Sequence, residues 1–442
     1  MTVARERAIL VKVLLSRGDL RGDEDPLSEL RRLTESAGGL VVGSIIQRRH
    51  GIDGSLYVGH GKAEEIQRLA LARQAETVIF DNDLSPAQVR NLEKVIQAKV
   101  LDRSELILDI FATRARTAEA RLQVELAQLE YTYPRLQRMW THLSRLAQGG
   151  IGLRGPGETQ LETDRRIVRD RIADLRRQIR DIERRRERQV RSRAGKFTVG
   201  LVGYTNAGKS SLLNALTGEQ AYVADKLFAT LDTRTRAWTL PYGLRVLLSD
   251  TVGFIRDLPH HLVTSFRATL EEARHADLLL HVVDLSAADA AGQIEAVNAV
   301  LAEIGCAEKP ALIVFNKVDL LPAEDHRLNV LLHHHPDSVT VSALRGTGLD
   351  ALRERVLALL GGPVRSLTIR GPSGDGAWQS AVARHATELE RQFADGQTII
   401  RTSLPQHLAD YLLKEFPHLD LTLHRLGEPR VAKSRSKRRS AS

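Results

Sequence analysis

The sequence predicts a multidomain α/β protein, and three features carry that prediction. Short apolar runs alternate with helical patterns over residues 1–112 and again over 196–362. Strands that alternate with helices in this way form mainly parallel sheets. Between these two regions, the apolar side chains follow a heptad spacing, which predicts a helical coiled-coil hairpin. The length of 442 residues leaves room for about three domains.

Residues 1–112 are expected to form an N-terminal α/β subdomain. Apolar runs predict its strands and amphipathic segments predict its helices, in the order strand 8–15, strand 40–46, helix 63–72, strand 77–80, helix 86–96 and strand 99–101. Helices between successive strands are typical of parallel crossover units.

Residues 113–195 are expected to form two helical arms joined by a glycine-rich tip. Apolar residues step by four and three along the first arm, at Leu122, Leu126, Leu129, Tyr133, Leu136, Trp140 and Leu143. The second arm repeats this spacing at Ile172, Leu175, Ile179 and Ile182, and it is rich in arginine. Pro134 should kink or break the first arm, because proline lacks the N–H that the helix needs.

Residues 196–362 are expected to form a central α/β domain with a mainly parallel sheet. Its buried strands are predicted at 197–202, 244–248, 278–283 and 311–315. Residues 363–429 predict a small C-terminal α/β domain, with strands 366–370, 398–402 and 420–424 and helices 377–392 and 405–414. Residues 430–442 are a basic tail that is expected to be disordered.

The composition limits the environment and the partners. The net charge of +9 and the pI of about 9.8 favour polyanionic partners. Cys306 is the single cysteine, so an intramolecular disulfide is impossible. No apolar stretch approaches about 18 residues, so we expect a cytoplasmic protein without a membrane span. We also expect the protein to be a monomer. Aromatic residues make up 4% of the chain, which argues against an RNA surface built on stacked bases.

A phosphate-binding loop follows the first strand of the central domain. Its nucleotide-binding residues are predicted to be Gly203, Tyr204, Thr205, Asn206, Ala207, Gly208, Lys209, Ser210 and Ser211. The glycines allow backbone N–H groups to surround phosphate, and the following helix adds its positive end. Lys209 should reach the β- and γ-phosphates, and the Ser210 hydroxyl should ligate Mg²⁺.

A second candidate motif follows the next apolar strand and consists of Asp250, Thr251, Val252 and Gly253. A carboxylate at this strand end suits a role in holding Mg²⁺ through water, and Gly253 lets its N–H approach the γ-phosphate. A turn with Asp and Gly is common in proteins. This motif alone is therefore weak evidence, and the other motifs of the nucleotide site support it.

The third and fourth motifs predict guanine as the base. Asn316, Lys317 and Asp319 follow a strand, and Ser342, Ala343 and Leu344 follow another. The Asp319 carboxylate can accept two hydrogen bonds from the guanine ring N–H and amine, whereas adenine offers neither donor. All motifs in this order predict an enzyme that binds GTP and GDP and hydrolyses GTP.

The segment between the first two motifs should respond to the γ-phosphate. Its predicted contacts are Phe228, Ala229, Thr230, Leu231 and Asp232. A threonine hydroxyl here completes the Mg²⁺ shell when the γ-phosphate is present. We expect Thr230 in this role, with Thr233 and Thr235 as alternatives. Lys209, Thr230 and Gly253 are thus the predicted catalytic residues.

Phe254 follows Gly253, where many signalling GTPases carry a glutamine that orients water. A phenylalanine cannot orient water. One interpretation is slow intrinsic hydrolysis that a partner accelerates. The other is that Phe254 only packs within the switch, and that the activating group comes from elsewhere.

The chain resembles the HflX family, a branch of the Obg-related translation GTPases, over nearly its whole length. The most specific stretch is GGIGLRGPGETQLETDRR at 149–166, and GFIRDLP at 253–259 and GSLYVGHGK at 54–62 are also typical. The resemblance implies binding to the large ribosomal subunit and its rRNA, and GTP-dependent splitting or rescue of stalled ribosomes under stress. It also implies Mg²⁺ positions at Ser210 and Thr230. An alternative is an enzyme that remodels rRNA or assists assembly on free RNA or subunits.

Three further segments keep two interpretations each. Gly152, Arg154, Gly155 and Gly157 are candidate RNA-binding residues at the hairpin tip, and the alternative is a solvated coiled coil with a flexible tip. The turn with Gly59, Gly61 and Lys62 could bind a second nucleotide, although a simple connection between strand and helix is favoured. Asn206 could support K⁺, as in related GTPases, although bracing of the loop by hydrogen bonds is favoured.

Overall fold

The structure, a computed structural model, describes residues 6–15, 25–146, 160–191, 197–218, 227–228, 234–256, 267–322, 325–386, 390–394 and 396–424. Within these ranges, only the backbone is described for residues 136–146, 160–164, 183, 186–191, 267–270 and 423–424. The chain divides into two compact units. One unit comprises Met1–Arg236 and Leu247–Thr347, and the other comprises Ala237–Val246 and Gly348–Ser442.

The N-terminal part of the first unit contains a four-stranded parallel sheet in the order β2-β1-β3-β4. Its elements are β1 (Arg7–Leu14), α1 (Ser28–Ser36), β2 (Leu40–Arg48), α2 (His60–Arg73), β3 (Thr77–Phe80), α3 (Pro86–Ile96), β4 (Lys99–Asp102) and α4 (Arg103–Arg114). Local sequence fixes two helix starts: Ser85 and Gln88 form a capping box ahead of α3, and the Asp102 carboxylate caps α4. The predicted order of strands and helices is confirmed, with two helices, α1 and α4, as additions.

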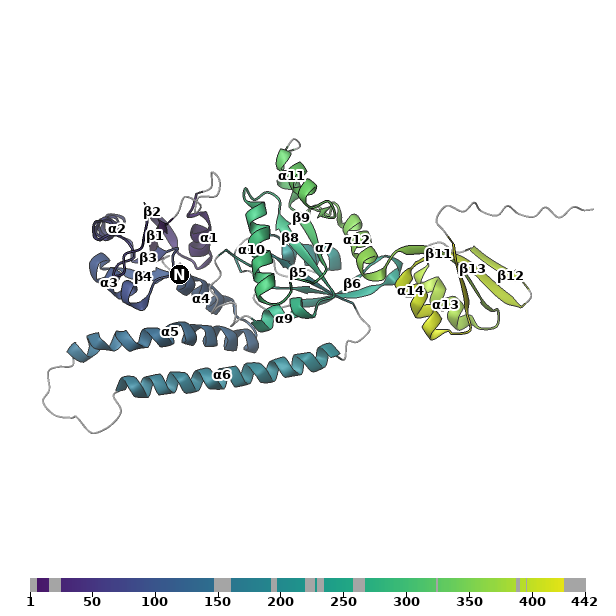
Figure 1. Cartoon of the computed structure of the whole chain (residues 1–442), viewed down its shortest axis with the longest axis horizontal. Helices are drawn as coiled ribbons and strands as arrows, with labels where there is room; N and C mark the ends of the chain where they lie inside the picture. Colours follow the sequence, from purple (N-terminus) through teal and green to yellow (C-terminus); the bar gives the residue numbers. More distant parts are fainter. Residues whose placement is uncertain are drawn as a thin grey trace, which may run out of the picture. The chain divides into compact units, whose positions relative to one another are not determined.

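Two long helices, α5 (Ala118–Leu146) and α6 (Gln160–Arg191), form the predicted hairpin and lie side by side (Figure 1). Their apolar seam buries Leu126, Ile172, Leu175 and Ile179. Arg165 lies over the Tyr133 ring, whereas Arg171 pairs with Glu125 at 2.8 Å. Arg165, which comes earlier in α6, therefore contacts a later residue of α5 than Arg171 does. The two arms are antiparallel, as Figure 1 also shows.

Pro134 does not break the first arm, because α5 continues through it to Leu146. A proline removes one backbone hydrogen bond and crowds the carbonyls of the preceding turn. Here the Arg135 guanidinium donates to the carbonyl of Tyr131 at 3.0 Å and stacks 3.3 Å from the centre of the Tyr131 ring. These contacts and the packing of α5 against α6 stabilise the helix around Pro134.

The base of α5 is fixed to the N-terminal sheet by a buried polar cluster. Tyr131 donates to Asp102 at 2.8 Å, and Arg135 donates to the same carboxylate at 3.0 Å. Glu105 lies at the edge of this cluster, 3.4 Å from the Tyr131 hydroxyl. Burial, together with Asp102 and Asp109, raises the pKa of Glu105 from 4.5 to about 7, while Lys99 and Arg135 oppose the shift.

We expect Glu105→Gln to stabilise the protein above pH 7. The folded state binds a proton at Glu105 more readily than the unfolded state, so stability falls as pH rises from about 4.5 to about 7. The amide removes this loss, which is on the order of 2 kcal/mol above pH 7 and absent below pH 4.5. Thermal unfolding at pH 5 and pH 8 measures it. Glu415→Gln on the exposed face of α14 (Gln406–Glu415) is the matched control, and an equal gain at both pH values would contradict the prediction.

The rest of the first unit is the central domain, with a six-stranded sheet in the order β10-β9-β8-β5-β7-β6. Its elements are β5 (Thr198–Gly203), α7 (Lys209–Thr217), β6 (Arg234–Thr239), β7 (Arg245–Asp250), α9 (Arg267–His275), β8 (Leu278–Asp284), α10 (Ala290–Glu303), β9 (Ala311–Asn316), α11 (His326–His334) and β10 (Val339–Thr340). The pairings from β10 through β7 are parallel, as predicted. Strand β6 was not predicted, because five of its six side chains are at least partly exposed polar or small residues.

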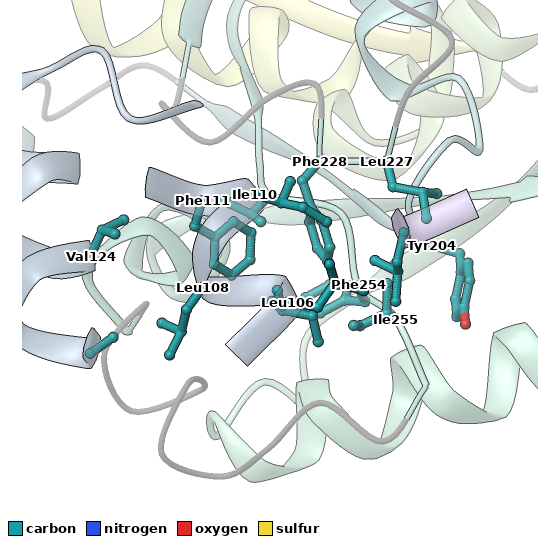
Figure 2. Packing of buried hydrophobic residues seen from close by; sticks show 14 of the residues in the cluster. Leu106, Leu108, Ile110, Phe111, Val124, Tyr204, Leu227, Phe228, Phe254 and Ile255 are labelled. Carbon is teal, nitrogen blue, oxygen red and sulfur yellow. The ribbon is translucent and has the colours of Figure 1, made fainter. Parts of the chain in front are cut away.

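One hydrophobic core joins the N-terminal part to the central domain. Phe111 of α4 meets Phe228 edge to face, with ring centroids 4.6 Å apart. Phe254 and Leu227 belong to the same cluster, and Figure 2 shows these side chains gathered between α4 and the central domain. Val124 of α5 is also a member. The first unit is thus built around apolar side chains from the hairpin, from α4 and from the segments beside the phosphate loop.

The second unit contains a four-stranded antiparallel sheet in the order β12-β13-β11-β14. Its elements are α12 (Leu349–Gly361), β11 (Val364–Pro372), α13 (Gly376–His385), β12 (Glu390–Ala394), β13 (Gln397–Pro405), α14 and β14 (Asp420–His424). The turn between β6 and β7 also belongs to this unit. Tyr242 in that turn packs against the cluster around Trp378, and its carbonyl lies 2.8 Å from His385 Nδ1.

The predicted helix 377–392 is wrong in its second half. Helix α13 ends at His385, and the chain forms β12 from Glu390. All five residues of β12 are exposed at the sheet edge, so they lack the alternation that marks a half-buried strand. Gly396, with a φ of 74°, follows Asp395, and an Asp-Gly pair is a common hairpin turn. Among the described residues, no helix is long and apolar enough to cross a membrane.

Candidate active site

Two glycines of the phosphate loop are required by close contacts. Gly203 ends β5 with a φ of 148°, and a Cβ there would lie 2.2 Å from the carbonyl oxygen of Val282. Gly208 precedes α7 with a φ of 91°, and a Cβ there would lie 2.3 Å from Asn316 Nδ2. Any side chain at either position would displace backbone or a side chain of the site. The loop is therefore held closely against β8 and the end of β9.

Lys209 is the first residue of α7 and is buried beneath the loop. Its Nζ donates to the carbonyls of Gly203 at 3.0 Å and Tyr204 at 2.8 Å. Burial lowers the pKa of Lys209 to about 8, and the nearby Asp250 carboxylate partly opposes this. A bound phosphate would favour the charged ammonium, because an opposite charge raises the pKa of a lysine. The loop thus holds a positive group where phosphates bind.

Ser210 and Asp250 meet beside Lys209. The Ser210 hydroxyl donates to Asp250 Oδ2 at 2.6 Å, and Asp250 is fully buried at the end of β7. A hydroxyl and a carboxylate are hard oxygen donors of the kind that Mg²⁺ prefers, and Mg²⁺ usually binds one or two protein oxygens together with phosphates and water. These two residues therefore fit a Mg²⁺ site completed by nucleotide.

The segment after Asp250 lies directly on the phosphate loop. The Thr205 N–H donates to the carbonyl of Phe254 at 2.6 Å, and the Phe254 N–H donates to the carbonyl of Gly203 at 3.1 Å. A Cβ on Gly253 would lie 2.7 Å from Thr205 Cα and 3.0 Å from Lys209 Nζ. Glycine is thus required at 253, because the phosphate loop and Lys209 leave no room for a side chain.

The residues expected to select the base converge from β9 and from the segment after β10. Ser342 donates to Asp319 Oδ1 at 2.6 Å, which orients the carboxylate. Asn316 donates to the carbonyl of Ala207 at 2.9 Å and accepts from the Ala343 N–H at 3.0 Å. Asn316 therefore ties the base-binding segments to the phosphate loop, and a single frame positions base and phosphates.

Lys317 adopts a left-handed conformation with a φ of 64°, and its Nζ pairs with Asp284 at 2.6 Å. Such a backbone conformation is uncommon outside glycine, and it occurs often at functional sites. The ion pair holds the lysine stem across the end of β8. Asp284 was not predicted, although its position at the carboxyl end of a central parallel strand could have identified it.

Comparisons with known proteins agree with this geometry. The family model described as "50S ribosome-binding GTPase" matches residues 198–317. The models described as "GTP-binding GTPase N-terminal" and "GTP-binding GTPase Middle Region" match residues 24–112 and 114–193. A protein of Escherichia coli strain K12 named GTPase HflX is 45% identical over 405 residues, which are 91% of this chain and 94% of that protein. The chain belongs to the HflX family of GTPases.

Other HflX proteins show similar agreement. A GTPase HflX of Caldanaerobacter subterraneus subsp. tengcongensis is 48% identical over 357 residues, which cover 80% of each chain. Among solved structures, the GDP complex of a GTP-binding protein from Sulfolobus solfataricus is 25% identical, with a TM-score of 0.42 over 80% of this chain and 98% of that one. As a member of the HflX family, the chain is a GTP hydrolase.

Several predicted site residues lie outside the described part of the chain. These are Ala229, Thr230, Leu231 and Asp232, together with the alternative Thr233 and the tip residues Gly152, Arg154, Gly155 and Gly157. Of the remaining predictions, Thr251 donates its hydroxyl to the carbonyl of Leu201 at 2.6 Å and so braces the sheet. Leu344 is 85% exposed, and Asn206 has the left-handed φ of 61° that asparagine tolerates well.

The HflX chain uses Phe254 as a packing residue. Its side chain is buried in the core shared with Phe111 and Phe228, and its backbone is bonded to the phosphate loop. This arrangement agrees with the interpretation that Phe254 packs within the switch. Acceleration of hydrolysis by a partner stays a prediction.

Residues outside the central domain, which were not predicted as part of the site, hold the segments beside the phosphate loop. The Leu227 N–H donates to the Ser36 hydroxyl at 3.1 Å, and the Tyr204 hydroxyl donates to Glu29 at 2.6 Å. Ser36 and Glu29 both belong to α1, more than 170 residues away in sequence. A single sequence contains no pattern that predicts contacts between residues so far apart in the chain.

Proposed function

We propose that this HflX GTPase binds the large ribosomal subunit and uses its GTP cycle to split or rescue stalled ribosomes, with the α5–α6 hairpin as the acting element. One observation carries the proposal: the core beside the nucleotide site includes the base of the hairpin. Phe228 and Phe254 flank the phosphate loop, and Ala120, Val124 and Ala127 of α5 belong to the same cluster. Packed cores resist continuous deformation. A shift of Phe228 or Phe254 on nucleotide exchange would therefore displace the α5 residues that pack in the same core.

The charges of the hairpin support an RNA partner. Arg171 and Arg176 are used within the hairpin, because they pair with Glu125 and Glu130 of the other arm. Arg177 and Arg184 form ion pairs one turn back along α6, with Asp174 and Asp181, while 71% and 72% of their side-chain surface stays exposed. Exposed guanidinium groups along a helix are well suited to phosphate contacts, which provide affinity without sequence preference.

The cofactor proposed for this function is Mg²⁺. Ser210 would ligate it directly, Asp250 would hold it through water, and Thr230 would complete the shell in the GTP state. When bound, the ion supplies charge neutralisation for the phosphates. K⁺ beside Asn206 stays a prediction.

Replacing residues 149–157 by a Gly-Ser linker of equal length should abolish ribosome splitting and leave GTP binding intact. The tip is separated from the phosphate loop by the whole of α6, so its replacement leaves the nucleotide site unchanged. Arg154 can contact phosphate or a base edge, and its glycine neighbours permit close approach to the RNA backbone. Light scattering of intact ribosomes mixed with the variant and GTP measures dissociation. Splitting at the parent rate would eliminate the tip as the acting element.

Two controls define what the light-scattering result means. The variant must bind GTP with the parent affinity, and an Arg154→Lys variant, which retains the charge, should split ribosomes at an intermediate rate. Co-sedimentation on sucrose gradients, with GTP or GDP, identifies the bound particle. Binding to free RNA or immature subunits without binding to intact ribosomes or large subunits would favour the alternative role in rRNA remodelling or assembly.

A further inference from the structure

Two consecutive buried residues, Asp102 and Arg103, connect different parts of the first unit. They stand where β4 meets α4, and they are 0% and 5% exposed. A buried charge costs several kcal/mol unless other groups pair with it. Both residues are paired, and their partners include residues from two different parts of the first unit. Arg103 contacts the nucleotide-binding region, and Asp102 contacts the hairpin.

Arg103 reaches the switch segment that follows Gly253. Its guanidinium donates to the carbonyl oxygen of Arg256 at 3.0 Å and to Asp81 at 2.6 Å, and it forms a short ion pair with Glu29. Burial disfavours the charged guanidinium, but Glu29 and Asp81 outweigh this effect and raise the pKa of Arg103 above its usual value. The side chain is therefore a permanently charged, rigid fork with three partners.

The contact with Arg256 is part of a closed ring of hydrogen bonds. Glu29 accepts from the Tyr204 hydroxyl at 2.6 Å, and that hydroxyl accepts from the Arg256 N–H at 2.8 Å. Arg103 then joins the Arg256 carbonyl to Glu29 and completes the ring. Tyr204 belongs to the phosphate loop, and Arg256 lies three residues after Gly253. The ring thus joins Arg256, at the end of the Gly253–Arg256 segment, to Tyr204 of the phosphate loop and to Glu29 of α1.

Asp102 faces the first arm of the hairpin. It accepts from Tyr131 at 2.8 Å and from Arg135 at 3.0 Å, and Arg135 also donates to the carbonyl of Leu84 at 3.1 Å. The Asp102 carboxylate also caps α4 by accepting from the Glu105 N–H at 2.9 Å. The start of α4 is therefore bonded through adjacent residues to α5 and to the switch. Adjacent Cα atoms are held about 3.8 Å apart, so neither residue moves alone.

We propose that the Asp102–Arg103 pair transmits the nucleotide state between the Gly253–Arg256 segment and the first hairpin arm, with Arg103 as a positioning residue for that segment. A γ-phosphate that draws in Gly253 changes the position of the Arg256 carbonyl, and Arg103 follows because its fork is bonded to it. The start of α4 moves with Arg103, and Asp102 passes the movement to Tyr131 and Arg135. The inference rests on the proposed function only in taking the hairpin as the output.

Hydrogen–deuterium exchange of the full-length protein tests this coupling without ribosomes. In the parent protein, amides near Tyr131 and Arg135 should differ in protection between GDP and a non-hydrolysable GTP analogue. Arg103→Lys keeps the charge and loses the fork, so it should lose this difference in α5 and keep the difference in the phosphate loop. The variant should also lower kcat with little change in KM, because it misplaces the switch and leaves the nucleotide contacts in place.

Two further variants keep the test decisive. Glu29→Gln, at a partly exposed position of the ring, should reduce the α5 difference even if Arg103→Lys fails to fold. Arg176→Lys loses its fork contact with Glu130, next to Tyr131, but lies off the route, so it should keep the full difference. An α5 difference that is absent in the parent, or unchanged in Arg103→Lys and Glu29→Gln, would overturn the proposal. Failure of ribosome splitting with a normal exchange pattern would instead count against the proposed function alone.

Discussion

Asp319→Asn should change the preferred nucleotide from GTP to xanthosine triphosphate. We propose that, in the parent protein, the carboxylate accepts from the guanine ring N–H and amine. A hydrogen bond to a charged group contributes about 1.5–3 kcal/mol, so losing the one that the amide reverses should lower GTP affinity by roughly 10–10²-fold or more. Xanthine carries an oxygen in place of the guanine amine, and the asparagine amide can donate to it.

The surroundings of Asp319 favour this exchange. Ser342 donates to Asp319 Oδ1 at 2.6 Å, and an asparagine at 319 can keep that bond through its amide oxygen. Its NH₂ group then occupies the place of Oδ2 and faces the base. The change therefore reverses one donor–acceptor pair and preserves the shape of the site.

Titration of the variant with labelled GTP and xanthosine triphosphate measures the exchange. Asp350→Asn is the matched control, because the Asp350 side chain is 92% exposed on α12 and its ion pair with Arg353 lies within that helix. The control should keep the parent preference. An Asp319→Asn protein that still prefers GTP would mean that another group selects the base.

Lys209→Ala should nearly abolish GTP hydrolysis. The ammonium lies against the carbonyls of Gly203 and Tyr204, so it is held in place before the nucleotide arrives. Removing one preorganised group that stabilises developing charge costs about 10²–10³-fold in kcat. The loss here should be at least of that order, because the same lysine also contributes to phosphate binding.

Lys309→Ala provides a closely matched control. The Lys309 Nζ also donates to a backbone carbonyl, that of Ala276 at 2.7 Å, but the residue follows α10, away from the phosphate loop. Steady-state phosphate release with saturating GTP compares the two variants. Turnover near the parent rate in Lys209→Ala would place the active site elsewhere. A comparable loss in both variants would indicate damage to the fold instead of to the site.

The sequence was sufficient for features that depend on neighbours along the chain. The strand 77–80 and the helix 86–96 were predicted with the observed bounds, because apolar runs and amphipathic spacing are local features. The phosphate loop was equally accessible, because Gly203, Gly208 and Lys209 must follow each other at fixed spacing to surround a phosphate. The convergence of Asn316 and Ser342 follows from the shared carboxyl edge of a parallel sheet.

The features that were missed depend on partners that are distant in sequence. Arg103 and Glu29 looked like ordinary charged residues, and only the packing of α4 and α1 on the central domain brings them to Tyr204 and Arg256. Pro134 was misjudged in part for the same reason, because Arg135 and the second arm support the helix across it. The prediction missed strand β12 for a different reason. A strand that is exposed along its length lacks the alternation of apolar and polar residues that indicates a strand in the sequence.

The turn between β6 and β7 has an evolutionary consequence. Strand β6 follows the switch segment directly, and the turn that ends it is assigned to the second unit, with Tyr242 packed in that unit's core and bonded to His385. A domain that is merely appended to a chain can be lost by an early stop codon without harm to what precedes it. Here a stop codon after Gly362 would remove the residues that pack against Tyr242, which lies 120 residues upstream. The C-terminal unit can therefore be gained or lost in evolution only together with compensating changes in the β6–β7 turn.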